Sequence, residues 1–167
     1  MKLGNGAVLR IGPYPDADTP STTVVVAVES ARVREALAAM LGALEHFRVV
    51  GEVDTADAAV EVARIQHPDL ALVELELSGC GGWWAIKQIQ AERLAGVVVA
   101  LGRRAQTTPN QLVGVGAYVQ MGTSPRDLLM AVEAAMKSAA RVSGPDAEQD
   151  LLTSTHPVLD KPALVDF

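Results

Sequence analysis

The sequence predicts a doubly wound α/β domain, in which helices cover both faces of one parallel sheet. Two observations support this fold class. Short continuous runs of aliphatic residues, such as 23–28 and 97–101, are typical of strands buried on both faces. The segments between such runs carry apolar residues at helical spacing. Five strands alternating with five helices imply right-handed crossovers and a single parallel sheet.

The expected elements follow one another in a regular order. We expect strands at residues 23–28, 47–53, 70–75, 97–101 and 117–120, and helices at about 33–44, 55–66, 83–94, 109–115 and 125–142. Thr55 is a candidate N-cap of the second helix. Ser124 should cap the final helix, with Pro125 at its first position and Asp127 completing a capping box.

The chain of 167 residues has room for one domain with a core and for terminal segments. Residues 1–21 are rich in glycine and proline and are expected to form a flexible N-terminal arm. Residues 22–142 should form the domain. Residues 143–167 are expected to form an acidic tail, which Pro157 and Pro162 interrupt and which is either mobile or docked by its apolar residues, namely Leu151, Leu152, Val158, Leu164 and Phe167.

Composition excludes several classes of function. The net charge of −6 argues against direct binding of nucleic acid, whose phosphates attract cationic surfaces. No apolar run is long enough to cross a bilayer, so no membrane contact is expected. With one cysteine, Cys80, and no secretory signal, the expected location is the reducing cytoplasm. The three histidines are far apart and predict no metal site, and no cofactor fingerprint occurs.

The part of the chain from about 22 to 140 resembles the receiver domain of bacterial two-component response regulators, especially those with DNA-binding output domains. A proline and an aspartate lead into the strand at 70–75, which ends near Glu74 and a glycine-rich loop. The segments that match the family in order and spacing are 33–37, 49–53, 67–73, 114–118 and 123–125. The resemblance implies the flavodoxin-like receiver fold, with strand order 2-1-3-4-5.

The same resemblance implies a phosphorylation pocket, and this sequence departs from it. Receivers have two acids after strand one that bind magnesium, an aspartate after strand three that accepts phosphate, a hydroxyl residue after strand four and a lysine after strand five. The matching positions here are Val28 and Glu29 for the acid pair, Glu74 for the acceptor, Leu101 for the hydroxyl and Met121 or Gln120 for the lysine. We therefore expect a degenerate pocket without metal or cofactor.

These departures predict a pseudo-receiver, which is a phosphorylation-independent signalling module and not an enzyme. Its expected partner is a protein, a second copy of the chain, or both. The resemblance implies an interface on the face formed by the helix at 109–115, the strand at 117–120 and the final helix. The candidate interface residues are Val113, Tyr118, Gln120, Met130 and Lys137, together with Trp84, because one of the adjacent Trp83 and Trp84 is expected to be exposed.

Several alternatives remain open from the sequence. Glu74 is either a permanent mimic of the phosphorylated state or a solvated, unpaired acid at a strand end. The alternative function is a small-molecule sensor that uses a pocket of Glu29, Glu74, Leu101 and Met121. We interpret Cys80 as an incidental loop cysteine, and the pair Arg103 and Arg104 as solvated. The alternative to one exposed tryptophan is that Trp83 and Trp84 both pack partly against loops.

Overall fold

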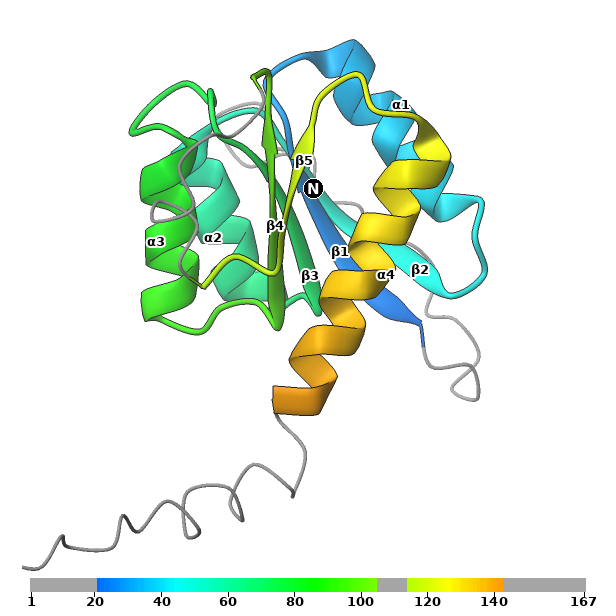
Figure 1. The fold of residues 1–167 in the computed structure, drawn as a ribbon. Coiled ribbons are helices and arrows are strands. Elements are labelled where there is room, and N and C mark those ends of the chain that lie inside the picture. The colour runs from blue at the N-terminus through cyan, green and yellow to red at the C-terminus, as the bar shows by residue number, and fades with distance from the viewer. Residues whose placement is uncertain (1–20, 105–113, 143–167) are drawn as a thin grey trace, which may run out of the picture.

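The computed structural model describes residues 21–104 and 114–142, where strands and helices alternate along the chain (Figure 1). The strands are β1 (Thr22–Ala27), β2 (Phe47–Val53), β3 (Leu70–Glu74), β4 (Val97–Gly102) and β5 (Ala117–Gln120). The helices in these residues are α1 (Ala31–Gly42), α2 (Ala56–Gln66), α3 (Gly82–Ala91) and α4 (Pro125–Val142).

The five strands form one parallel sheet in the order β2-β1-β3-β4-β5, which confirms the predicted fold class and strand order. Helices α1 and α4 cover one face of the sheet and α2 and α3 cover the other (Figure 1). Strands β2 and β5 form the two edges. The sheet is therefore sandwiched between two helical layers, as in doubly wound folds.

Alternation along β3 fixes the face on which the site lies. Leu70 and Leu72 pack in the cluster under α1 and α4, whereas Ala71 and Val73 pack under α2 and α3. Because successive side chains of a strand point to opposite faces, Glu74 belongs to the α1 and α4 side. All five residues of β3 are buried.

Local signals define the helix ends as expected. The Thr55 side chain accepts a hydrogen bond from the backbone N–H of Ala58 at 3.3 Å and caps α2. The Ser124 hydroxyl accepts from the N–H of Asp127 at 3.2 Å and donates to its carboxylate at 2.7 Å. The predicted caps of these two helices are confirmed.

Some boundaries differ from the prediction. The first strand lies one residue earlier, at Thr22–Ala27, and the third helix ends at Ala91. The helix expected at 109–115 falls largely outside the described residues, but its predicted end is wrong, because Gly114 lies in a turn with a φ of +84°. That backbone conformation suits glycine and interrupts a right-handed helix.

Of the predicted terminal segments, residues 1–20 and 143–167 lie outside the described residues, so the arm and the tail stay predictions. Within 21–104 and 114–142, no helix combines the length and the apolar character that crossing a bilayer requires.

Candidate functional site

The carboxyl ends of the parallel strands meet at one edge of the sheet, where α/β proteins commonly bind ligands. Glu29 lies two residues after β1, Glu74 is the last residue of β3, and Arg103 directly follows β4. Because β1, β3 and β4 are neighbours in the sheet, these residues come together from distant parts of the sequence. They form a small charged cluster at this edge.

Glu74 is a buried carboxylate with a partner on each oxygen. The residue is 1% exposed. Its Oε2 accepts a hydrogen bond from the backbone N–H of Glu29 at 2.9 Å, and its Oε1 accepts one from Nη2 of Arg103 at 3.2 Å. A buried carboxylate requires such pairing, and charge-assisted hydrogen bonds are the stronger kind. The alternative of a solvated, unpaired Glu74 is therefore wrong.

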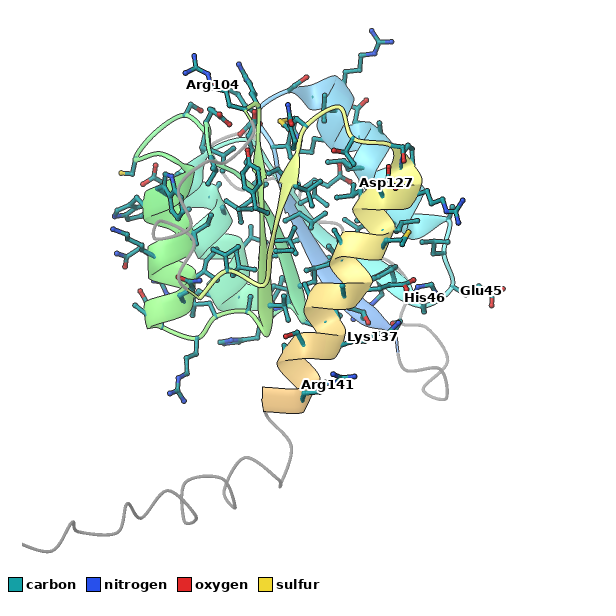
Figure 2. The ribbon with its side chains drawn as sticks, in the orientation of Figure 1. Glu45, His46, Arg104, Asp127, Lys137 and Arg141 are labelled. Carbon is teal, nitrogen blue, oxygen red and sulfur yellow. The ribbon has the colours of Figure 1, made fainter. Side chains whose placement is uncertain are left out.

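Arg103 is a member of this charged cluster that was not predicted from the sequence. Its guanidinium also lies 3.8 Å from the carboxylate of Glu29, and its side chain remains 59% exposed. The interpretation that Arg103 is only solvated is wrong, although the neighbouring Arg104 is exposed and projects from this edge (Figure 2). The sequence pattern that could have predicted this contact is a basic residue directly after β4, since the neighbouring strand β3 ends in an acidic residue.

The loop after β1 is held in place so that its backbone faces Glu74. Nη1 of Arg34 donates to the carbonyl oxygens of Val28 at 2.7 Å and Glu29 at 3.2 Å. The N–H of Val28 donates to the carbonyl of Val53 at 3.0 Å. These bonds fix both peptide groups of the loop, so that the N–H of Glu29 is directed at the buried carboxylate.

The segment after β4 is attached at two further points. The backbone N–H of Arg103 donates to Oε1 of Glu76 at 3.4 Å, and the hydroxyl of Tyr118 donates to the carbonyl of Arg104. A side chain at Gly102 would collide with the ring of Tyr118, so glycine allows this approach. Burial, and secondarily the charge of Glu76, raises the pKa of Tyr118, which keeps the hydroxyl protonated as a donor.

The apolar residues predicted for the pocket are packed into the core. Val28 is fully buried and Leu101 is 3% exposed. Met121 packs against the same cluster, and a cavity that Leu101 and Met121 line has a volume of only about 70 Å³. Neither Glu29 nor Glu74 lines that cavity. Ligand-binding pockets are usually several hundred Å³ in volume, so this cavity does not favour the small-molecule sensor.

Some of the candidate interface residues are exposed and others are half-buried. Met130 is 59% exposed, and Lys137, seven residues along α4, lies on the same side of the helix. Gln120 is exposed on the edge strand β5, whereas Tyr118 is half-buried and hydrogen-bonded to the preceding loop. Val113 lies outside the described residues.

The glycine-rich loop before α3 contains Cys80, and the first turn of α3 contains Trp83 and Trp84. Trp83 and Trp84 are both half-buried, with Trp84 against the core under α2 and α3, so the expectation that one of them is exposed is wrong. Cys80 is exposed, and its thiol donates to Oδ1 of Asp57 at 3.5 Å. This hydrogen bond, then burial and the Asp57 charge, raises the pKa of the thiol and disfavours the nucleophilic thiolate.

The strand order and the charged carboxyl edge together define a flavodoxin-like α/β domain. The model of the response regulator receiver domain matches residues 24–133. The chain therefore belongs to the response regulator receiver domain family.

Similar proteins agree with this assignment. The chain is 31% identical over 140 residues to the transcriptional regulatory protein PdtaR of Mycobacterium tuberculosis, an alignment that covers 82% of this chain and 68% of PdtaR. It is 26% identical over 137 residues to the response regulator GacA of Pseudomonas aeruginosa, covering 80% of this chain and 64% of GacA.

Solved structures share the fold. The response regulator domain of Thermotoga maritima CheB matches with a TM-score of 0.64 and 19% identity, over 74% of this chain and 99% of that domain. The receiver domain of the Pseudomonas aeruginosa sensor histidine kinase PA1611 matches with a TM-score of 0.61 and 20% identity, over 70% of this chain and 98% of that domain.

Proposed function

We propose that this chain is a pseudo-receiver, a regulatory module that works without phosphorylation by binding a protein partner, a second copy of itself, or both. The receiver family supplies the fold and the regulatory role. The finer assignment rests on one observation, which is the state of the acid at the acceptor position.

Glu74 is already neutralised by the protein itself. Its two oxygens bond to Arg103 and to the backbone of Glu29, and the residue is almost fully buried. Phosphoryl transfer depends on a positioned acceptor and on cations that neutralise the transferred group. Here the Arg103 cation pairs with the acceptor carboxylate itself, and both carboxylate oxygens accept hydrogen bonds within the protein, which disfavours in-line attack on a phosphodonor.

The residues at this edge also do not fit magnesium. Magnesium requires nearly octahedral oxygen ligands at about 2.0–2.1 Å. Val28 offers no side-chain oxygen, and the Arg103 guanidinium lies 3.2 Å and 3.8 Å from the carboxylates of Glu74 and Glu29. In the described parts of the chain, no three acidic, histidine or cysteine side chains are grouped to hold a metal ion.

The pair of Glu74 and Arg103 supports a further role as a permanent stand-in for the phosphorylated state. In this role the carboxylate takes the place of the phosphoryl group and the guanidinium takes the place of the cation. The pair anchors the segment after β4 to the end of β3, and Glu76 and Tyr118 hold that segment at two more points. The segment is then fixed without any modification.

The exposed side of α4 and β5 is the proposed contact surface. It presents Met130 and Lys137 from α4 and Gln120 from β5. The net charge of the chain is −6, which supports a protein partner and not direct contact with nucleic acid.

The test is exposure of the purified chain to a small phosphodonor, such as acetyl phosphate, with magnesium. Intact mass spectrometry should show no phosphorylated species, because Glu74 is engaged and no lysine or hydroxyl completes the site. A receiver with the full set of family residues serves as the positive control under the same conditions.

A stable acyl phosphate located at Glu74 by peptide mapping would overturn the proposal. Phosphorylation that persists in Glu74→Gln would instead place the modification at another acid, and would also contradict the assignment as phosphorylation-independent.

A further inference from the structure

An open groove lies between α4 and the amino-terminal ends of β4 and β5, at the edge of the sheet opposite the charged cluster. Its volume is about 400 Å³, within the range of clefts that bind ligands or side chains. The groove is lined by three glycines, Gly96, Gly114 and Gly116, and by small side chains that are mostly apolar, among them Val97, Val115, Ala135 and Ala139.

Close packing at Gly116 shapes the groove. A Cβ at this position would lie 2.7 Å from Cγ1 of Val97 and 3.2 Å from Cβ of Ala135, so glycine lets α4 approach the sheet here. Beyond this contact, Ala139 and Ser138 are too small to fill the space between helix and sheet. The groove therefore offers apolar surface to aliphatic side chains.

The position of the groove points to the chain's own C-terminal segment as its occupant. α4 ends at Val142, three residues or about 4.5 Å of helix rise beyond Ala139. The sequence continues with Ser143, Gly144 and Pro145, and glycine and proline are residue types that disfavour a helix interior. The nine residues from Val142 to Leu151 can span up to about 30 Å when extended, which is ample for Leu151 and Leu152 to return to the groove.

Charge favours the same occupant. Residues 146–150 include Asp146, Glu148 and Asp150, immediately before the two leucines. Arg141 lies in the last turn of α4, near the end from which the chain leaves the helix (Figure 2), whereas Lys137, one turn earlier, is paired with Glu133 at 3.7 Å. An acidic segment next to this basic helix end is attracted over a short distance, and salt screens that attraction.

We propose that the acidic segment 146–152 docks in this groove, with Leu151 and Leu152 against Val115 and Ala139 and with the acids near Arg141. The docked segment covers the side of α4 that faces β5 and thereby restricts access of partners to this part of the surface. The docking of this segment does not depend on whether Glu74 can be phosphorylated.

The test uses methyl-labelled full-length protein. Nuclear Overhauser effects should connect the methyl groups of Leu151 or Leu152 with those of Val115 or Ala139. In the variant Leu151→Asp/Leu152→Asp these signals should vanish, and the amide of Gly116 should exchange about tenfold faster, as expected when a local contact that protects it is lost.

Two matched controls define the result. Leu159→Asp/Leu164→Asp makes the same chemical change farther along the tail and should leave the groove signals intact. Arg141→Glu should weaken the contact, whereas Arg126→Glu at the opposite end of α4 should not. Circular dichroism and thermal unfolding verify that each variant keeps the fold.

Three outcomes would overturn the proposal. The first is the absence of contacts between the leucines and the groove in the wild-type chain. The second is contacts that appear only between differently labelled molecules, which would assign the groove to a second copy. The third is contacts from Leu112 or Val113, which would assign it to the segment after β4.

Discussion

At the scale of single residues, the main feature of the charged edge is the pairing of Glu74 with Arg103. The family's positive charge after the fifth strand is missing, because the matching position holds Met121 or Gln120. A cation is nevertheless present, because Arg103 reaches the carboxylate from the end of β4 at 3.2 Å. The buried carboxylate of Glu74 thus has a cationic partner within the same chain.

A double-mutant cycle measures this pairing. Glu74→Gln and Arg103→Gln should each lower the free energy of unfolding by about 1–3 kcal/mol, because each leaves a buried polar group with a lost or altered partner. The double variant should cost less than the sum by about 1 kcal/mol. Urea unfolding gives all three values.

The ion pair of Arg64 and Glu92 provides the control cycle. Its groups are 2.9 Å apart and are 49% and 41% exposed. Exposed pairs contribute about 0–1 kcal/mol, so its coupling should be the smaller of the two. Strictly additive effects of Glu74 and Arg103 would contradict the pairing.

The thiol of Cys80 yields a prediction about pH. Asp57 accepts the S–H hydrogen bond and repels the thiolate, which raises the pKa of Cys80. Asp57→Asn removes the negative charge, so the pKa should fall and the thiolate fraction at neutral pH should rise. The midpoint of the iodoacetamide alkylation rate against pH should move to lower pH.

Glu61→Gln is the matched control, since Glu61 is another exposed acid of α2 that does not bond to Cys80. An unchanged alkylation profile in Asp57→Asn would show that the hydrogen bond does not control the thiol.

At the scale of elements, capping and loop attachment determine where α4 and the segment after β4 lie. α4 starts at Pro125 behind the Ser124 cap, and its first turn packs Leu128 against the core. The segment after β4 is attached to β3 by Arg103 and to β5 by Tyr118. These attachments join elements that the chain order keeps apart.

Ser124→Ala tests the cap. Loss of the hydroxyl leaves the N–H of Asp127 without its side-chain partner, and the free energy of unfolding should fall by about 1 kcal/mol. Thr123→Ala is the control, because this exposed neighbour lies outside the capping box. Equal losses in both variants, measured by thermal unfolding, would contradict a specific capping role.

At the scale of the whole molecule, the two exposed large apolar residues in the described parts of the chain lie on opposite faces. Met130 on α4 is 59% exposed and Ile65 on α2 is 51% exposed. α4 covers one face of the sheet and α2 the other (Figure 1). Only the α4 side carries the proposed contact surface.

Met130→Lys should therefore weaken self-association or partner binding at least tenfold, which corresponds to about 1.4 kcal/mol. Buried apolar anchors at interfaces have effects of this size. Ile65→Lys should leave the affinity unchanged. Sedimentation velocity measures self-association, and a larger effect of Ile65→Lys would place the interface on the other face.

The sequence by itself determined the α/β class, the strand order through the family resemblance, and the caps at Thr55 and Ser124. These features depend on local periodicity, on short capping motifs and on chain order, all of which can be read from the linear sequence. Tertiary structure alone decided that Glu74 is buried and paired, that Arg103 supplies the cation, and that both tryptophans are partly covered. Such contacts arise because parallel strands bring their carboxyl ends to one edge, and no local pattern encodes which side chains then meet.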